Sequence, residues 1–217
     1  MSFDTSLDHD AAERLPVIAI GTSAGGLEAS RALLRNIPGD TQAAFVLIQH
    51  LDPLHHSMMV DLLAPHTELK VVQAAEGLAL QPGCLYVIPP GVFLTVAQHV
   101  LHLSEPEDGK SVRLPFDVLL HSLATDTTAR PGCIVLSGTG TDGSLGSVEI
   151  HAVGGLVIAQ DPTEASYSGM PDSAIATGSV AQILPIDQIP AALKHFLETD
   201  PAPAPLAPAQ SDADKAK

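Results

Sequence analysis

Residues 16–26 read PVIAIGTSAGG, and they join a short apolar run to a turn made of small residues. The run at 16–21 is continuously apolar, rich in β-branched residues and closed by a glycine, which is typical of a strand buried on both faces of a parallel sheet. Residues 27–37 then repeat leucines at helical spacing, and Pro38-Gly39 ends that pattern. The stretch therefore predicts a strand, a tight turn and a helix, which is the first unit of an α/β fold.

The same alternation of strand and helix patterns continues along the chain. Strands are expected at 43–50, 70–74, 84–89, 132–137, 155–160 and 180–184, and helices after Ser57 and at 116–125, 144–153, 173–177 and 188–197. Segments 92–97 and 99–104 alternate apolar and polar residues, as the two strands of a hairpin do. The sequence predicts an α/β fold with a mostly parallel sheet and a small antiparallel hairpin.

Both ends of the chain differ in composition from this alternating region. Residues 1–15 are polar and acidic, and we expect a disordered lead there. Residues 199–217 alternate Pro and Ala between charged ends, which is typical of an extended tail or linker. The expected domain therefore spans residues 16–198.

The chain is strongly acidic, with 25 Asp and Glu against 10 Lys and Arg and a formal net charge of −15. An acidic surface without a basic run disfavours nucleic-acid binding and attachment to anionic membranes. No apolar stretch reaches the ~20 residues that span a bilayer, and the N-terminus does not resemble a signal peptide. We therefore expect a cytoplasmic protein without membrane insertion.

The two cysteines, Cys84 and Cys133, lie far apart in apolar runs and lack metal-ligand spacing. They are expected to be small buried side chains, with a single disulfide left open as an alternative. His55, His56 and His66 follow His50, but neighbouring histidines in a loop point in different directions and no helical ligand pair accompanies them. No metal site and no cofactor site is predicted.

Three polar residues follow buried strands, where a parallel α/β sheet gathers its functional groups. Ser23 lies in the glycine turn after the first strand, His50 follows the second, and Asp142 lies between glycines after the strand at 132–137. A serine nucleophile, a histidine base and an acid need proximity in space and not a fixed order in sequence. The three strand ends predict a catalytic triad.

Each of these residues also has a structural interpretation. Ser23 can cap a helix, Asp142 can form a turn, and His50 can be a satisfied structural residue. The segment GTSAG matches the nucleophile elbow of α/β-hydrolases, but only 22 residues precede Ser23 and His comes before Asp. The glycines also lack the spacing of a dinucleotide-binding loop, and no GK[ST] of a P-loop follows.

Several long stretches resemble the catalytic domain of the chemotaxis-type protein-glutamate methylesterases, the CheB family. They are IGTSAGGLEA, the QH of VLIQHLDP, YVIPPG, RLPFDVLLHSLA, LSGTGTDGSLG and AQDPTEASYSGMPDSAIATG. The likeness covers residues 17–196 and is closest to modules fused to a methyltransferase. It implies a doubly wound sheet with helices on both faces.

The resemblance also implies residue roles. Ser23 corresponds to the nucleophile, His50 to the general base and Asp142 to the third triad member, with oxyanion donors among the backbone N–H groups near Ala24 and Thr139. The implied reaction is hydrolysis of glutamate γ-methyl esters on a chemoreceptor or a receptor-like signalling protein, with glutamine deamidation as a second activity. A methyltransferase or a response regulator acting in trans is an implied partner.

Two features depart from the family pattern. Ala24 stands where the family often has Thr, and Thr139 stands where it often has Met. In addition, only 16 residues precede Val17, which leaves no room for a phospho-receiver domain there. The module is then either unregulated or controlled by another chain or by a module beyond the tail. A non-catalytic module that binds a receptor or kinase, and a small-molecule esterase, are the alternative functions.

Overall fold

The computed structural model describes residues 14–49, 58–106 and 114–199. Seven parallel strands form one sheet in the order β3-β4-β2-β1-β7-β8-β9. Its strands are β1 (Leu15–Thr22), β2 (Ala44–Gln49), β3 (Lys70–Gln73), β4 (Cys84–Val87), β7 (Ala129–Val135), β8 (Leu156–Gln160) and β9 (Gln182–Leu184). The predicted mostly parallel α/β sheet is confirmed.

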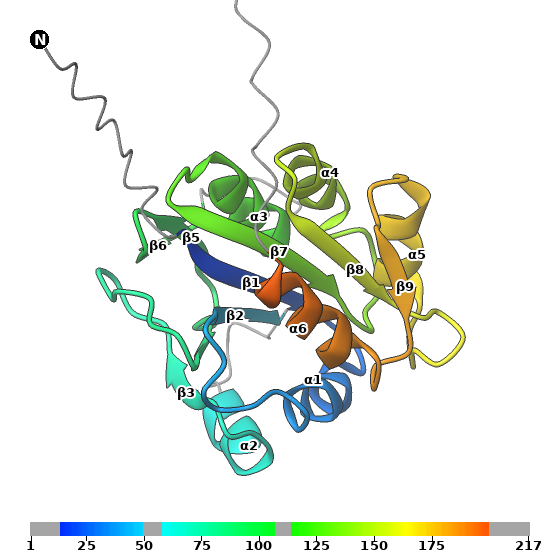
Figure 1. Ribbon diagram of the computed structural model, residues 1–217, viewed down its shortest axis with the longest axis horizontal. Helices are drawn as coiled ribbons and strands as arrows, with labels where there is room; N and C mark the ends of the chain where they lie inside the picture. The colour runs from blue at the N-terminus through cyan, green and yellow to red at the C-terminus, as the bar shows by residue number, and fades with distance from the viewer. Residues whose placement is uncertain (1–13, 50–57, 107–113, 200–217) are drawn as a thin grey trace, which may run out of the picture.

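Helices cover both faces of this sheet (Figure 1). They are α1 (Gly26–Leu34), α2 (Met59–Leu63) with a short 3-10 turn after it (Ala64–His66), α3 (Pro115–Thr125), α4 (Ser144–Ala152), α5 (Gly169–Ala176) and α6 (Ile189–Glu198). On one face α1, α2 and α6 pack against the sheet, and on the other α3, α4 and α5 do. This is the doubly wound arrangement that the resemblance implied.

The central strand β1 shows why one apolar run supports two cores. Its side chains alternate between the faces, so that Val17 and Ala19 join the core under α3, α4 and α5. Ile18 and Ile20 join the core under α1, α2 and α6. All four side chains are fully buried, as expected for a strand covered on both faces.

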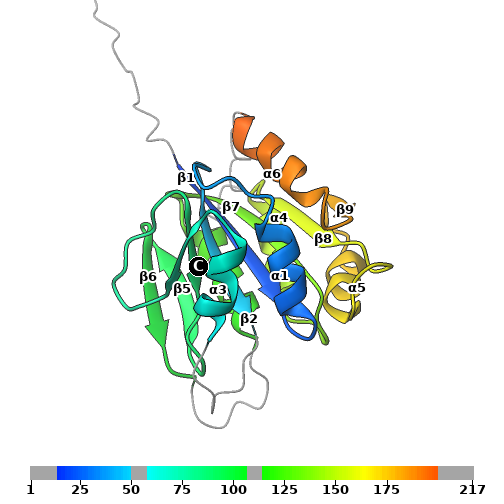
Figure 2. The same cartoon turned by 90° about the horizontal axis from the view of Figure 1, so that it is seen from below.

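A two-stranded antiparallel sheet, β5 (Phe93–Ala97) with β6 (Val100–Ser104), packs beside α3 at the end of the molecule opposite α5 (Figure 2). The predicted hairpin is confirmed, but its second strand begins one residue later than expected. Gln98 and His99 both have positive φ, 51° and 63°, and form the two-residue turn. The predicted strands left only residue 98 for the turn, because a two-residue turn usually contains Asn or Gly and neither is present here.

Some helix ends also differ from the prediction. Helix α1 ends at Leu34, and Asn36 and Ile37 form a tighter turn in which each N–H bonds to the carbonyl three residues earlier. Helix α5 begins at Gly169, four residues earlier than the sequence pattern indicated. The predicted cap at Ser57 lies outside the described residues. Both cysteines are buried free thiols, so the disulfide alternative is wrong, and burial raises the pKa of Cys133 to about 12.

Candidate functional site

The strand order places the site at the switch point of the sheet. β1 lies at the centre between β2 and β7: the chain passes from β1 to β2 on one side, and after β3 and β4 it continues on the other side of β1 with β7, β8 and β9. Crevices for ligands form at the carboxyl ends of strands where the order reverses in this way. Ser23 follows β1 directly, and the loop that carries Asp142 follows β7. The strands adjoining these two segments are therefore neighbours in the sheet.

Ser23 is half-buried and faces the loop after β7. Its N–H donates to the carbonyl of Ser137 at 3.1 Å, and its own carbonyl accepts from Gly26 at 3.0 Å. A Cβ atom added to Gly138 would lie 3.0 Å from Ser23 Cβ and would overlap Met170. Glycine at 138 thus permits the close approach of Ser23 to the β7 loop. Within the described part of the chain, the Ser23 hydroxyl makes no hydrogen bond.

Ser137 connects the nucleophile turn with two other segments. Its carbonyl accepts from the Thr22 hydroxyl at 2.7 Å as well as from Ser23, and its hydroxyl donates to the carbonyl of Ala24 at 2.9 Å. The same hydroxyl accepts from the N–H of Tyr167 at 3.1 Å, while the Ser137 N–H donates to Oε1 of buried Gln160 at 2.9 Å. One residue therefore joins the end of β1, the loop after β8 and β8 itself.

Replacing Ser137 with alanine should destabilise the fold by about 1–3 kcal/mol, because the carbonyl of Ala24 and the N–H of Tyr167 lose a shared partner. Chemical denaturation measures this change. Ser144→Ala is the matched control, since it removes an exposed hydroxyl that donates to the carbonyl of Thr141 at 2.7 Å. Equal losses in the two variants would contradict the role given to Ser137.

Asp142 is held at the start of α3. Its Oδ2 accepts from the N–H of Phe116 at 3.1 Å, and its Oδ1 accepts from the N–H of Asp117 at 3.0 Å. Free N–H groups at a helix N-terminus stabilise negative charge, so this carboxylate is both oriented and stabilised in its ionised form. The Phe116 ring fills the space over Gly143 and Gly21, where added Cβ atoms would overlap it.

His50 lies outside the described residues, so its geometry stays a prediction. The residue before it, Gln49, ends β2 and is paired in register with Thr22, the residue before Ser23. The two predicted oxyanion donors are described: no acceptor for the N–H of Ala24 or Thr139 lies among the residues that the structure describes. Within the described part of the chain, nothing occupies these two N–H donors, so a ligand oxygen can accept from them.

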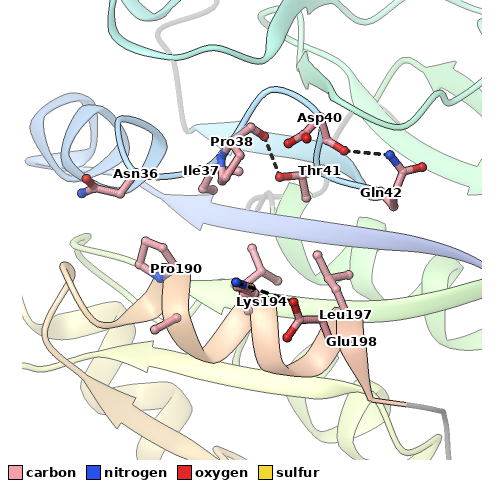
Figure 3. Close-up of a pocket in the computed structure, with 12 residues that line it drawn as sticks. Asn36, Ile37, Pro38, Asp40, Thr41, Gln42, Pro190, Lys194, Leu197 and Glu198 are labelled. Carbon is pink, nitrogen blue, oxygen red and sulfur yellow. Dashed lines mark hydrogen bonds and ion pairs between the residues drawn. The ribbon is translucent and has the colours of Figure 1, made fainter.

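A separate groove of about 570 Å³ lies between the α1–β2 connection and α6 (Figure 3). Pro38, Pro190 and Leu197 are among its lining residues, and Lys194 pairs with Glu198 at its edge at 3.7 Å. The connection at 36–42 precedes β2, so it lies toward the amino ends of the strands. Among the described residues, none of the predicted site residues lines this groove, and we assign the site to the opposite edge.

Four residues of the site were not found by sequence reasoning. They are Phe116, Asp117, Ser137 and Gln160. Each is hydrogen-bonded to a partner that is distant in sequence, from the 23 positions between Ser137 and Gln160 to the 115 positions between Thr22 and Ser137. All four lie in stretches that carried the family resemblance. Those stretches were a signal for the site, although they gave these residues no role.

The fold and site define an α/β domain with a candidate serine-hydrolase centre at its switch point. A family model described as CheB methylesterase matches residues 18–193. The chain belongs to the CheB methylesterase family.

Similar proteins agree with this assignment. The chain is 33% identical over 194 residues to a protein-glutamate methylesterase/protein-glutamine glutaminase of Dechloromonas aromatica, covering 87% of this chain and 54% of that protein. It is 41% identical over 131 residues to an uncharacterized 104.1 kDa protein of Rhodobacter capsulatus, covering 60% of this chain and 14% of that protein. The chain thus spans about half, or less, of these relatives.

A solved structure supports the fold. The CheB methylesterase catalytic domain of Thermotoga maritima superposes with a TM-score of 0.76 at 28% identity, covering 84% of this chain and 98% of that chain. Among the described residues, no helix is long and apolar enough to cross a membrane.

Proposed function

We propose that this chain hydrolyses γ-methyl esters of glutamate side chains in proteins, with Ser23, His50 and Asp142 as its catalytic triad. The observation that carries the proposal is the position of Ser23 at the switch point of a CheB-type fold, against Gly138 in the loop after β7, the loop that also carries the anchored Asp142. Relatives named as protein-glutamate methylesterases support the substrate class.

The proposed reaction proceeds in two steps. Ser23 Oγ attacks the ester carbonyl carbon while His50 accepts the hydroxyl proton, and the tetrahedral intermediate collapses when His50 returns that proton to the departing methanol. Water then attacks the acyl-enzyme with His50 as base, which releases the glutamate carboxylate and restores Ser23. Asp142 orients the imidazole and stabilises its charged form, while the N–H groups of Ala24 and Thr139 face the developing oxyanion.

The same acyl transfer acts on an amide as well as on an ester. Attack on a glutamine side chain would release ammonia in place of methanol and leave the same acyl-enzyme. Relatives of this chain are named as both methylesterases and glutaminases, which supports deamidation as a second activity. The proposed protein substrate is a methylated chemoreceptor or a receptor-like signalling protein, with a methyltransferase or a response regulator as a partner in trans.

Methanol release tests the proposal directly. The chain is incubated with a peptide that carries a glutamate γ-methyl ester, and with the same peptide carrying glutamine, while methanol and ammonia are measured. The proposal expects methanol from the ester peptide. Binding of the ester peptide without any methanol would favour a non-catalytic binding module, and faster turnover of simple aryl esters than of the peptide would favour a small-molecule esterase.

Replacing His50 with glutamine should lower methanol release by about a thousandfold or more, because the serine then loses its general base. His151→Gln is the matched control, since His151 lies exposed at the end of α4. The control should keep wild-type turnover. If His50→Gln kept more than a tenth of the wild-type rate, the role given to His50 would be wrong.

A further inference from the structure

Helices α3 and α4 begin side by side, and neither is capped by its own N-cap residue. The N-cap of α3 is Leu114 and that of α4 is Gly143, and neither provides a side-chain hydrogen bond to its helix. Helix N-termini leave N–H groups that need acceptors, and an Asp, Asn, Ser or Thr at the N-cap normally supplies one. The acceptors for these two helices come from elsewhere.

Each helix receives its acceptor from the other. Asp142, just before α4, accepts hydrogen bonds from the N–H groups of Phe116 and Asp117 in the first turn of α3. Asp117, in that first turn, accepts from the N–H of Gly146 in the first turn of α4 at 2.8 Å. The two carboxylates therefore cap the two helices reciprocally, and the position of each depends on the other.

The Asp117 carboxylate is partly buried, although an ionised carboxylate is more stable in water. Its Oδ2 is buried and, within the described part of the chain, lacks a hydrogen bond of good geometry. Burial raises the pKa of Asp117 above its ordinary value and Glu149 adds to the rise, although the N–H groups of Gly146, Gly143 and Leu145 act in the opposite direction. A buried carboxylate with incomplete partners is a poor stabiliser, so stability alone does not explain an acid at this position.

We propose that Asp117 is a positioning residue, which holds the loop carrying Asp142 so that the Asp142 carboxylate keeps its catalytic orientation. The inference rests on the proposed role of Asp142 in the triad. Without the Asp117 acceptor, the first turn of α4 loses an anchor to α3, and the residues immediately before it move with it. Small displacements of catalytic groups reduce the rate much more than they reduce substrate binding.

Asp117→Asn is the first test, because the amide keeps an acceptor for the N–H of Gly146 but replaces the second, buried carboxylate oxygen with an NH2 group. We expect kcat for methanol release to fall about threefold to tenfold with KM unchanged, and Asp117→Ala to lower kcat about tenfold to a hundredfold. The fold should tolerate Asp117→Asn. The pKa of Asp117 is raised in the folded state, so its ionised form at neutral pH lowers the free energy of unfolding. The uncharged amide of Asp117→Asn removes this destabilising effect.

Asp126 provides a matched control at the other end of α3. It also accepts bonds through Oδ1, from the N–H and hydroxyl of Thr128 at 2.9 and 2.6 Å, and its Oδ2 is likewise buried without a partner among the described residues. Asp126→Asn should leave kcat within about twofold of wild type, because it contacts neither Asp142 nor its loop.

The double variant Asp117→Asn/Asp142→Asn separates a positioning role from a general structural one. If Asp117 acts through Asp142, the double variant should be no slower than Asp142→Asn alone. The proposal is overturned if the two losses multiply, if Asp117→Asn matches wild type, or if Asp126→Asn loses as much as Asp117→Asn.

Labelling of Ser23 by a fluorophosphonate makes this test independent of the ester substrate. The labelling rate reports activation of the serine, and it should fall in the Asp117 variants in the same order as kcat. If labelling falls in this order but no variant or wild-type protein releases methanol, the proposed methylesterase function fails and the positioning role stands. If methanol is released and the Asp117 variants label at the wild-type rate, the positioning role fails.

Discussion

Replacing Ser23 with alanine is expected to lower methanol release by about ten-thousandfold or more, because no other group supplies the attacking oxygen. The change removes only a hydroxyl that makes no hydrogen bond with the described residues, so the fold should be unaffected. Methanol release from the ester peptide measures the rate, and thermal unfolding measures the fold. KM is not expected to explain the loss, since the hydroxyl acts in the chemical step.

Ser30→Ala provides the control for this experiment. Ser30 lies in α1, seven positions after Ser23, is 1% exposed, and its Oγ lacks a partner among the described residues. Its replacement removes the same hydroxyl from the same structural unit and should leave turnover unchanged. Retention of more than about a hundredth of wild-type activity by Ser23→Ala would contradict its role as the nucleophile.

Replacing Phe116 with alanine is expected to destabilise the fold by about 3–5 kcal/mol, the usual range for a buried phenylalanine. The side chain is fully buried, and its ring lies over Gly21 at the end of β1 and Gly143 beside Asp142. Both neighbours are glycines, so no side chain is present there to fill the cavity. Thermal unfolding should show a fall of about 6–20 °C for a domain of this size.

Leu145→Ala is the control for the Phe116 experiment. Leu145 lies in α4 close to the same loop but is 65% exposed, so its loss should cost no more than about 0.5 kcal/mol. The Phe116 ring packs between the end of β1 and the loop that carries Asp142, and it supports both segments. Activity at a temperature where the variant is still folded should therefore also fall in Phe116→Ala. Equal stability of the two variants would show that the ring does not hold these segments together.

The fold was predictable from the sequence where burial alone determines the pattern. The run at 16–21 is apolar at every position because β1 is covered on both faces, and the strand appeared where expected. The hairpin turn was placed within one residue, and His99 was assigned to the second strand because the positive φ values of Gln98 and His99 occur in residues that seldom adopt them. The start of α5 was missed because Gly169 and Pro171 lie in its first turn and resemble a loop.

The site was predictable only in part. Strand ends indicated Ser23 and Asp142 as candidates because a parallel sheet brings its carboxyl ends to one edge, and their catalytic roles stay predictions. The reciprocal caps were invisible, since Asp117 and Gly146 are 29 positions apart and each carboxylate caps the other helix. Ser137 was missed for a similar reason, because its partners are Ala24, 113 positions away, and Tyr167, 30 positions away. Long-range hydrogen bonds of this kind leave no local pattern.

The most direct test of the account is to trap the acyl-enzyme. Wild-type protein is mixed with the glutamate γ-methyl ester peptide, quenched in acid during turnover, digested with trypsin and analysed by tandem mass spectrometry. Cleavage after Arg14 and Arg31 gives the peptide 15–31, which contains both Ser23 and Ser30. The account predicts an added glutamyl peptide, less methanol, on Ser23. Two results would contradict it. One is methanol release with the adduct on another residue. The other is methanol release without any adduct in the wild-type protein, together with a full rate in Ser23→Ala.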